Sequence, residues 1–351
     1  MNWKKLIPWG ICGCLLLSGC GQRLPVQENT NTERHEATTF AMDTIMTFAI
    51  YHDDGEELLI DTEQEIRRLE QMLSVTVEDS EINQLNENAG KEPVKLSEDT
   101  MALLEAGKEL GKETEHCFDI AISPVVKAWG FTEEEKHVPS QEELERLLPL
   151  THLEDLVIDG TDSTAYLQKE GMAVDLGGIA KGYASDSVTA LLKGKGVESA
   201  MLSLGGNISA IGHKPDGEKW KVAVANPLDD NGYVGLVQVS DCNVVTSGGY
   251  QRYFEENGKT YHHIINPATG YPADNGLLSV TILCKSGTKA DALSTALFVM
   301  GLERAEEYWK NHTDFEAIFI TEKGEVIATE GIAESFTLEN DDFAYSVVKR
   351  G

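Results

Sequence analysis

The sequence predicts a mixed α+β fold with largely antiparallel sheets and packed helices, and three observations predict it. Apolar residues recur at helical spacing in two segments, residues 56–73 and 97–112, which is typical of amphipathic helices. Short runs rich in β-branched and apolar residues predict strands at 199–204, 220–225, 233–239, 277–283 and 316–320. Residues 227–232, between two of these strands, form a turn-like segment rich in Pro, Asp and Gly. A turn there favours antiparallel pairing, because parallel strands need a longer crossover connection.

Length and composition indicate a compact folded protein. The chain has 351 residues, of which 41% are hydrophobic and 25% charged, enough to bury a large core in one domain or two. No low-complexity linker divides Thr38 from Lys349, so we expect one compact unit. The formal net charge of −30 argues against binding to nucleic acid or to an anionic membrane surface, because these need stripes of Lys and Arg. An anionic ligand would need a bound cation or backbone N–H groups at a helix start.

The N-terminus is predicted to direct export. Residues 1–5 carry two Lys, and residues 6–17 are apolar but too short to span a bilayer as a stable helix. The sequence Leu-Ser-Gly-Cys that ends at Cys20 resembles the lipobox of bacterial lipoproteins. On that resemblance residues 1–19 are a signal peptide, Cys20 becomes the lipid-modified first residue, and residues 20–37 form a polar tether. The protein would then be lipid-anchored to the cell membrane on its extracytoplasmic face. The alternative is an ordinary cleaved signal with an incidental Cys.

Two smaller features concern a helix start and the cysteines. Residues 140–143 (Ser-Gln-Glu-Glu) have the form of a capping box, which predicts a short helix that Pro149 closes. Cys117, Cys242 and Cys284 lie in apolar or strand-like contexts without a C-x-x-C spacing. This pattern argues against a disulfide scaffold or a zinc site and predicts buried thiols. An exported protein could still form one disulfide among these three.

A pair of oxygen-bearing side chains marks the predicted helix at residues 289–297. Asp291 and Thr295 are four residues apart, so both lie on one helix face with Cβ atoms roughly 5–6 Å apart. A carboxylate and a hydroxyl at that spacing suit a small hard cation, which predicts Mg²⁺. The alternative is that Asp291, near the helix start, only caps the helix or interacts with its dipole.

Two loops carry further candidate groups. Residues 175–186 follow an expected strand end at 172–174 and lead into a helix, and their glycines allow the backbone to approach a ligand closely. The segment does not match a Walker or Rossmann fingerprint, and it could equally be a tight turn without a ligand. In residues 262–270 the imidazole of His263 precedes a turn that contains Pro and Gly. An imidazole can act as an acid or base near neutral pH, although paired histidines are more often structural.

Aromatic residues follow a short motif that begins with an acid. Residues 119–124 (Asp-Ile-Ala-Ile-Ser-Pro) precede residues 128–131 (Ala-Trp-Gly-Phe). The Trp and Phe rings could stack on a planar ligand ring. The alternative is that they belong to the hydrophobic core, as most such rings do.

Seven segments occur in an order that resembles one family. They are residues 42–44 (Met-Asp-Thr), 74–86, 118–120 with 129–131, 175–186, 203–207, 263–270 and 291–297. In this order, and behind a lipobox, they resemble the FAD:protein FMN transferase (ApbE) family of bacterial lipoproteins. The resemblance covers Thr38 to about Ala328. It implies an ApbE-like, T-fold-like architecture, with the FMN transferase catalytic domain at residues 38–351.

The resemblance implies an enzyme that cleaves the pyrophosphate of FAD. It would move FMN onto a Thr or Ser hydroxyl of an exported partner, a flavin-accepting subunit or domain of a membrane redox complex, and release AMP. The Mg²⁺ ligands of the family carry over to the Asp291 carboxylate, the Thr295 hydroxyl and the Gly178 carbonyl. Its FAD contacts carry over to seven residues, namely Met42, Ala128, Trp129, Gly130, Asp175, Lys181 and Ile265.

The chemistry of phosphoryl transfer explains these residue types. The protein must position the attacking oxygen and neutralise charge on the phosphate oxygens, so Mg²⁺ held by Asp291 and the cation of Lys181 suit the substrate. Asp291 and His263 are the predicted catalytic residues, with His263 as the general base for the acceptor hydroxyl. His263 could instead bind a phosphate or hold its loop.

Two positions depart from the family pattern, and two other activities stay open. Thr76 stands where many relatives carry a Tyr that covers the flavin ring, and Asn266 replaces a frequent Asp before Pro267. The second change preserves a turn, since Asn and Asp serve turns in similar ways. The other activities are a metal-dependent FAD pyrophosphatase that releases FMN and AMP, and a lipoprotein that binds FAD without catalysis. A pure binder would not need Asp291 and Thr295 beside a diphosphate, which favours an enzyme.

Overall fold

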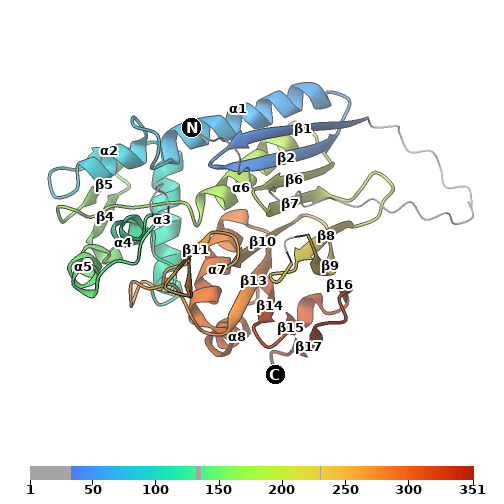
Figure 1. Cartoon of the computed structure of the whole chain (residues 1–351). Helices are drawn as coiled ribbons and strands as arrows, with labels where there is room; N and C mark the ends of the chain where they lie inside the picture. Colours follow the sequence, from blue (N-terminus) through green and yellow to red (C-terminus); the bar gives the residue numbers. More distant parts are fainter. Residues whose placement is uncertain (1–32, 132–135, 230) are drawn as a thin grey trace, which may run out of the picture.

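The computed structural model describes residues 33–131, 136–229 and 231–351, and its main element is a nine-stranded sheet (Figure 1). In order across the sheet, the strands are β1 (Arg34–Ala41), β2 (Thr44–Tyr51), β6 (Ser199–Leu204), β7 (Asn207–Gly212), β10 (Cys242–Gly248), β13 (Leu277–Cys284), β14 (Phe315–Thr321), β15 (Glu325–Thr329) and β17 (Ala344–Val348). Only β15 and β17 pair in parallel within the described part of this sheet; its other neighbours are antiparallel. The predicted α+β class with largely antiparallel sheets is therefore confirmed.

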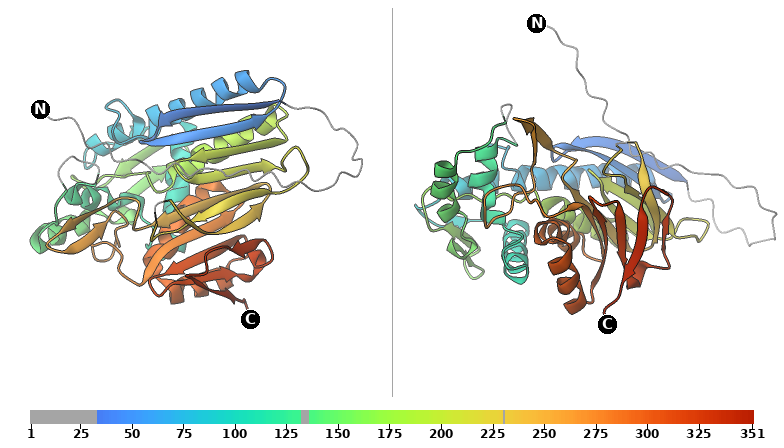
Figure 2. Two further views of the ribbon diagram at one scale, coloured as in Figure 1. Left: turned by 45° about the vertical axis from the view of Figure 1, so that its right-hand side comes forward. Right: turned by 60° about the horizontal axis from the view of Figure 1, so that its bottom comes forward.

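The sheet separates two layers, each with its own hydrophobic core (Figure 2). One face carries the helices α1 (Gly55–Leu73), α6 (Ala180–Gly194), α7 (Gly287–Met300) and α8 (Leu302–Asn311). The other face carries a three-stranded sheet of β16 (Phe336–Leu338), β9 (Tyr233–Val239) and β8 (Trp220–Ala225). The large helical core includes Phe48 and Leu293, whereas the smaller core includes Val224 and Phe336.

A third group of elements flanks the sheet and carries part of the candidate site. It contains α2 (Glu81–Glu87), α3 (Glu98–Glu113), α4 (Ser123–Trp129), α5 (Gln141–Leu147) and a small sheet of β3 (Val94–Lys95), β5 (Thr164–Leu167) and β4 (Leu156–Asp159). A separate hairpin is formed by β11 (Tyr253–Glu256) and β12 (Lys259–His262). A small apolar cluster that includes Val125, Trp129, Leu144 and Ile265 joins α4 to the loop after this hairpin.

Most predicted elements are confirmed with close bounds. The helices predicted at 56–73 and 97–112 are α1 and α3, each displaced by one residue at most. The predicted bounds of β6, β8 and β9 agree with the structure, and β13 and β14 are longer by one residue at one or both ends. The capping box is also confirmed, because Glu143 N donates to Ser140 Oγ at 3.2 Å where α5 begins.

Two expectations about segment type are wrong. Residues 172–174 are not a strand; Met172 N closes a turn with Lys169 O, and the Val174 backbone bonds the Asn86 side chain. Their apolar side chains enter the helical core from an irregular segment, which looks like a strand in sequence. In addition, β1 begins at Arg34, so the last residues of the expected tether lie in the sheet. Alternate residues of this edge strand are exposed, and its polar composition hides the strand.

The export features fall outside the described residues. This applies to the signal peptide, to Cys20 and to residues 20–32 of the expected tether. Within the described ranges, every helix is too short or too polar to cross a membrane. Among the described residues, Cys117, Cys242 and Cys284 are free thiols. Cys284 belongs to the core under the helices and Cys242 packs against the core on the opposite face, so the sheet itself lies between these two side chains.

Candidate active site

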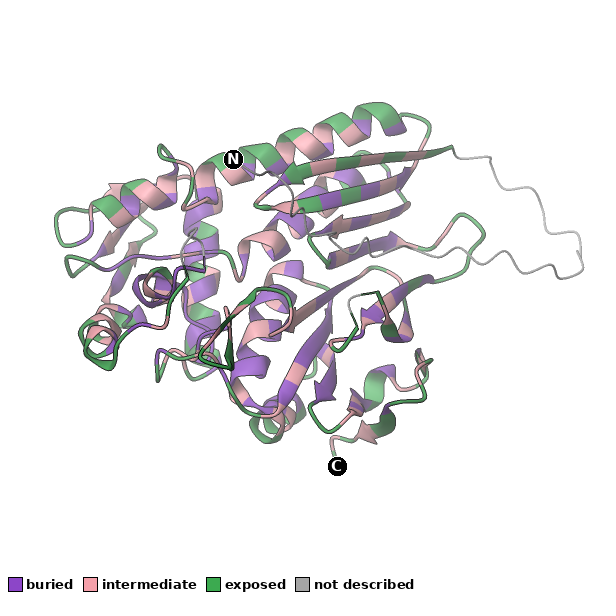
Figure 3. Ribbon diagram, in the orientation of Figure 1, coloured by how far each residue is buried: buried purple, intermediate pink, exposed green. Residues whose placement is uncertain are grey.

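The candidate site is built on α7, which is almost wholly buried between α6 and the sheet (Figure 3). The start of the helix is held from two sides. Lys289 N donates to Ser286 Oγ at 3.2 Å, and the Asp186 carboxylate accepts from Gly287 N at 2.6 Å and Thr288 N at 2.9 Å. These bonds satisfy backbone N–H groups that the helix itself leaves unpaired. The caps and the buried residues of the helix therefore fix the place of α7 in the domain.

Asp291 and Thr295 lie one turn apart on α7, as their spacing predicts. The Asp291 side chain is buried, and its Oδ2 accepts a hydrogen bond from Gly182 N at 2.9 Å. Lys181 Nζ lies 3.9 Å from the same oxygen. Thr295 Oγ1 is 3.2 Å from Ser247 Oγ on β10. Ser286 and Asp186 cap α7, so Asp291 is not the N-cap of its own helix. Its carboxylate instead accepts from Gly182 N in the first turn of α6, so Asp291 also caps the neighbouring helix.

Two glycines allow the segment before and within α6 to meet α7. A Cβ on Gly178 would lie 3.9 Å from Thr295 Oγ1, so the loop backbone passes beside that hydroxyl. A Cβ on Gly182 would lie only 2.2 Å from Gly287 O and 2.8 Å from Asp291 Cβ. No side chain fits at this crossing of two helix backbones, and the close approach is what brings Gly182 N to the Asp291 carboxylate.

The oxygens gathered here fit Mg²⁺. They are a carboxylate at Asp291, a hydroxyl at Thr295 and the backbone of Gly178 beside it. Across the described residues, no group of three His, Cys, Asp or Glu side chains could hold a metal ion. A site with one carboxylate and neutral oxygens is typical of Mg²⁺ when substrate phosphates and water complete its coordination.

The loop before α6 is folded by its own polar residues. Asp175 N donates to Ile120 O at 2.8 Å, and Asp175 Oδ1 accepts from Gly177 N at 2.7 Å. Lys181 Nζ donates to Gly177 O at 2.9 Å. Asp175 and Lys181 thus hold this loop in the structure, and the Lys181 cation lies 3.9 Å from the Asp291 carboxylate.

His263 follows β12 directly and faces the same region. Its ring Nδ1 lies 3.2 Å from Arg252 O, and its backbone N donates to that oxygen at 3.0 Å. Burial lowers the pKa of His263 to about 4, and the nearby charges of Arg252, His262 and Lys181 act in the same direction. The imidazole is therefore neutral at physiological pH, so it can accept a proton.

The turn that carries Met42 is conformationally unusual. Met42 and Asp43, between β1 and β2, have φ values of 47° and 57°, a left-handed region that side chains other than Gly rarely adopt. Met42 N donates to Glu70 Oε1 on α1. Arg252 Nη2 donates to Asp43 Oδ2 at 3.0 Å. Contacts on two sides thus hold Met42 in this turn, which is where strained backbone is expected to be functional.

The aromatic segment behaves differently from the expectation of a stacking face. The Trp129 indole is fully buried, and its Nε1 donates to Gly270 O at 2.7 Å. It packs against Tyr261 and Tyr271, with ring centroids 5.3 and 5.6 Å away. Ile265 is buried in the same cluster. The indole therefore offers no free face in this structure; it holds the loop at residues 263–270 against α4.

Several residues of the site had no clear signal in the sequence. Ser247 contacts Thr295 across 48 positions of the chain, and Arg252 contacts His263 across 11 and Asp43, the neighbour of Met42, across 209. Gly182 could have been recognised, since a glycine inside a helix usually marks a close approach. Thr76 is exposed, and its Oγ1 lies 2.8 Å from Ser74 Oγ.

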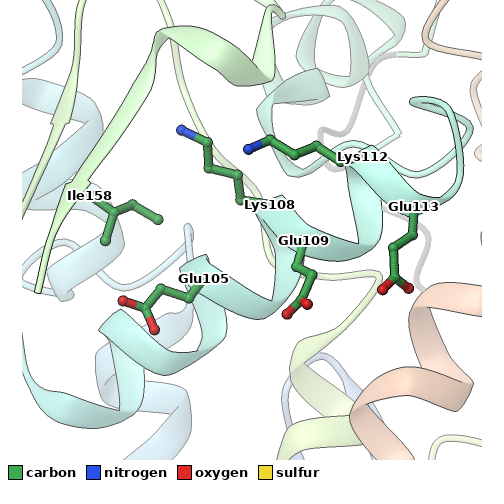
Figure 4. Close-up of a pocket in the computed structure, with 6 residues that line it drawn as sticks. All are labelled: Glu105, Lys108, Glu109, Lys112, Glu113 and Ile158. Atoms are coloured by element: carbon green, nitrogen blue, oxygen red, sulfur yellow. The ribbon is translucent and has the colours of Figure 1, made fainter.

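An open hollow elsewhere on the molecule shares no residue with this site. It lies along α3, where Lys108 and Lys112 extend to one side and Glu105, Glu109 and Glu113 to the other (Figure 4). The hollow is open to solvent and lined mainly by charged side chains, so it does not resemble an enclosed ligand pocket. The groups with possible chemistry remain those around α7.

The fold is that of flavin transferases in solved structures. The chain superimposes on the crystal structure of the ApbE protein from Thermotoga maritima with a TM-score of 0.81 and 31% identity, covering 86% of this chain and 99% of that one. It also matches the apo form of the Pseudomonas stutzeri flavinyl transferase ApbE, with a TM-score of 0.78 and 29% identity over 88% and 98% of the two chains.

The chain belongs to the ApbE family, whose family model matches residues 42–319. A protein from Klebsiella pneumoniae named FAD:protein FMN transferase is 35% identical over 265 residues, which cover 75% of this chain and 82% of the relative. A protein of the same name from Treponema pallidum is 33% identical over 349 residues, covering 93% and 94% of the two chains. The family resemblance seen in the motifs is thus confirmed.

Proposed function

We propose that the protein is an Mg²⁺-dependent FAD:protein FMN transferase. It would attach FMN through a phosphoester bond to a Thr or Ser of an exported partner and release AMP. The observation that supports this most strongly is the pairing of Asp291 and Thr295 on one face of α7 with Lys181 3.9 Å from the Asp291 carboxylate, together with an imidazole at His263 whose pKa is lowered by burial. A protein that only binds FAD would need neither a hard-cation site nor a base, whereas transfer to a hydroxyl needs both.

In the proposed step the acceptor hydroxyl oxygen attacks the phosphorus of the FMN half of FAD. A P–O bond to the acceptor forms while the bond from that phosphorus to the AMP oxygen breaks, and AMP leaves with the electron pair of that bond. The hydroxyl proton passes to Nε2 of His263, because Nδ1 is committed to Arg252 O. The lowered pKa of His263, about 4, keeps the imidazole neutral before the step.

The remaining polar residues would bind and orient the diphosphate. Mg²⁺, when bound, neutralises charge on the diphosphate oxygens. The residues that would hold it are Asp291, Thr295 and Gly178. Lys181 adds a positive charge on the same side, which in this acidic chain gives an anionic substrate local electrostatic support.

The FAD contacts are proposed for the surfaces around this centre. Met42 and Asp175 lie on its two flanking loops, and the backbone at Ala128 and Gly130 borders the loop after β12. Trp129 and Ile265 would shape the pocket from behind, because their side chains are buried. This assigns contact with FAD to Met42, Asp175 and the backbone at Ala128 and Gly130, and a supporting role to Trp129 and Ile265.

We also propose that the protein is a lipoprotein of the cell membrane on the extracytoplasmic face. The support is the apolar stretch followed by Leu-Ser-Gly before Cys20. We expect Cys20→Ala to release the protein from the membrane fraction or to leave an unprocessed precursor, since the thiol carries the lipid. Unchanged fractionation together with unchanged precursor mass, measured by mass spectrometry, would show that this Cys is incidental.

The experiment that tests the activity uses the full chain in detergent with FAD, Mg²⁺ and an acceptor domain that carries one Thr. We expect covalent flavin on the acceptor, seen by in-gel fluorescence, together with one AMP per flavin. The control is the same acceptor with that Thr replaced by Ala, which should stay unlabelled. FMN and AMP without labelled protein would show a pyrophosphatase, and FAD bound without products would show a binding protein.

A further inference from the structure

Arg252 makes two sets of contacts that meet at the candidate site. Its guanidinium Nη2 donates to Asp43 Oδ2 at 3.0 Å, across 209 positions of the chain. Its backbone oxygen accepts from His263 N at 3.0 Å and lies 3.2 Å from His263 Nδ1. One residue therefore connects the turn that carries Met42 with the candidate base.

We propose that Arg252 is a positioning residue, which holds His263 in a single tautomer and at a fixed place relative to the Met42 turn. This inference rests on the proposed function at one point, namely the role of His263 as the general base. Arg252 acts through His263 and need not touch the substrate.

The tautomer follows from the chemistry of the carbonyl. A carbonyl oxygen can only accept hydrogen bonds, so its partner Nδ1 must carry the ring proton. The lone pair of the neutral ring is then on Nε2, which is the nitrogen left to act as a base. The backbone N of His263 donates to the same oxygen. The Arg252 carbonyl therefore binds both the ring and the main chain of His263.

Arg252 directly precedes β11, and the bond from His263 N to its carbonyl extends the β11–β12 ladder by one pair. The side chain of Arg252 ties this end of the hairpin to the turn at Asp43. Arg252 lies between β10 and β11, outside both strands, and follows a segment that begins with Gly248 and Gly249. Its partner Asp43 sits in a turn that Met42 N ties to Glu70 on α1. A chain of contacts thus runs from α1 through the turn to Arg252, and from its carbonyl to His263.

The ion pair itself should matter little to overall stability. Both side chains are partly or largely exposed, and exposed ion pairs contribute little to the free energy of unfolding. The pair of Arg304 with Glu115 is a matched control. It is 2.8 Å long, joins distant parts of the chain and has a similarly exposed Arg, but it contacts no residue of the candidate site in the described structure.

The first test measures transfer by Arg252→Ala, Arg252→Lys and Arg304→Ala. We expect Arg252→Ala to lower kcat about tenfold, in line with the cost of misplacing a catalytic group, while its Tm stays that of the wild type. Arg252→Lys should recover part of the loss, since Lys keeps the charge opposite Asp43. Arg304→Ala should leave kcat unchanged. In a His263→Ala background, Arg252→Ala should cause no further loss, and an independent further loss there would overturn the proposal.

The second test does not depend on transfer activity. Nitrogen NMR of protein labelled with ¹⁵N in histidine, with His263→Ala to assign the signals, reports which ring nitrogen carries the proton. We expect a protonated Nδ1 and an unprotonated Nε2 for His263 in the wild type and in Arg304→Ala, and a mixture of tautomers in Arg252→Ala. An identical spectrum of His263 in Arg252→Ala would overturn the positioning role. Absence of transfer by the wild type would overturn the proposed function alone.

Discussion

The two halves of the candidate site are held in opposite ways. Asp291 and Thr295 lie on a buried helix, and a core of packed side chains and caps fixes them. His263 and Met42 are half-buried residues of loops, and a few polar contacts with Arg252 and Glu70 hold them. The metal half is therefore part of the structure of the domain, while the base and the flavin turn depend on a few polar bonds.

This difference predicts which variants separate activity from stability. Changes near α7 risk altering both, because a buried segment loses packing whenever its shape changes. Changes at these loops should alter activity alone, since few apolar contacts depend on them. The following variants test this contrast, beginning with the largest expected effect.

Asp291→Ala should abolish transfer, because it removes the one charged oxygen of the proposed Mg²⁺ site. Asp291→Asn is the sharper control, since it keeps the size of the side chain and an acceptor for Gly182 N. Both variants should be inactive in the flavin-labelling assay, and circular dichroism should show that Asp291→Asn is folded. Full activity of either variant in metal-free buffer would contradict the metal assignment.

His263→Ala should lower transfer by roughly 10²–10⁴-fold, the usual cost of a lost general base. Its affinity for FAD, measured by quenching of flavin fluorescence, should stay nearly unchanged, and so should its Tm. The variant would then lose catalysis but keep its binding of FAD. Loss of FAD binding in this variant would instead assign His263 to contact with the ligand.

Gly182→Ala tests the buried half. A Cβ there would meet Gly287 O at 2.2 Å, so we expect a loss of about 1–3 kcal/mol in the free energy of unfolding, as for other overpacked cores. Gly194→Ala is the matched control in the same helix, because nothing lies within 4 Å of its added Cβ. Urea unfolding should show a loss for the first variant only. Equal stabilities would show that α6 and α7 can move apart at no cost.

The pH profile should report the environment of His263. Since burial lowers its pKa from 6.5 to about 4, the neutral form persists above pH 5, and kcat should fall only as the pH drops through about 4. The unfolded chain binds this proton near pH 6.5, so the same group makes the folded state less stable as the pH falls from about 6.5 to about 4. An acid limb of kcat near 6.5 would mean that His263 is solvated in the working enzyme.

The sequence was enough to predict most helices and strands and the positions of the site residues on α7. The spacing of Asp291 and Thr295 predicted their shared helix face, because a helix relates residues four apart by geometry alone. Local patterns likewise located β6 and α1. The family resemblance added Gly178, which the structure places beside Thr295.

The half of the site that lies in loops could not be predicted in this way. The bond between Asp43 and Arg252 joins residues 209 positions apart, and no local rule encodes such a pairing. The direction of the Trp129 side chain depends on which loop packs behind it. The sequence suggested a ring that stacks on a ligand, whereas the structure has a buried ring that supports the loop at residues 263–270. The segment at 172–174 was misjudged because apolar residues enter a core from irregular backbone as readily as from a strand.

The placement of the cysteines bears on how the protein matures. Cys242 and Cys284 cannot meet while the sheet is formed, because they lie on its opposite faces. A disulfide between Cys242 and Cys284 would therefore require the sheet to be distorted, and the native fold does not need one. We expect this catalytic domain to reach its fold without an oxidase or isomerase, and to keep it equally in reducing and oxidising surroundings. The fold of this domain would then not depend on the redox state of the compartment in which it works.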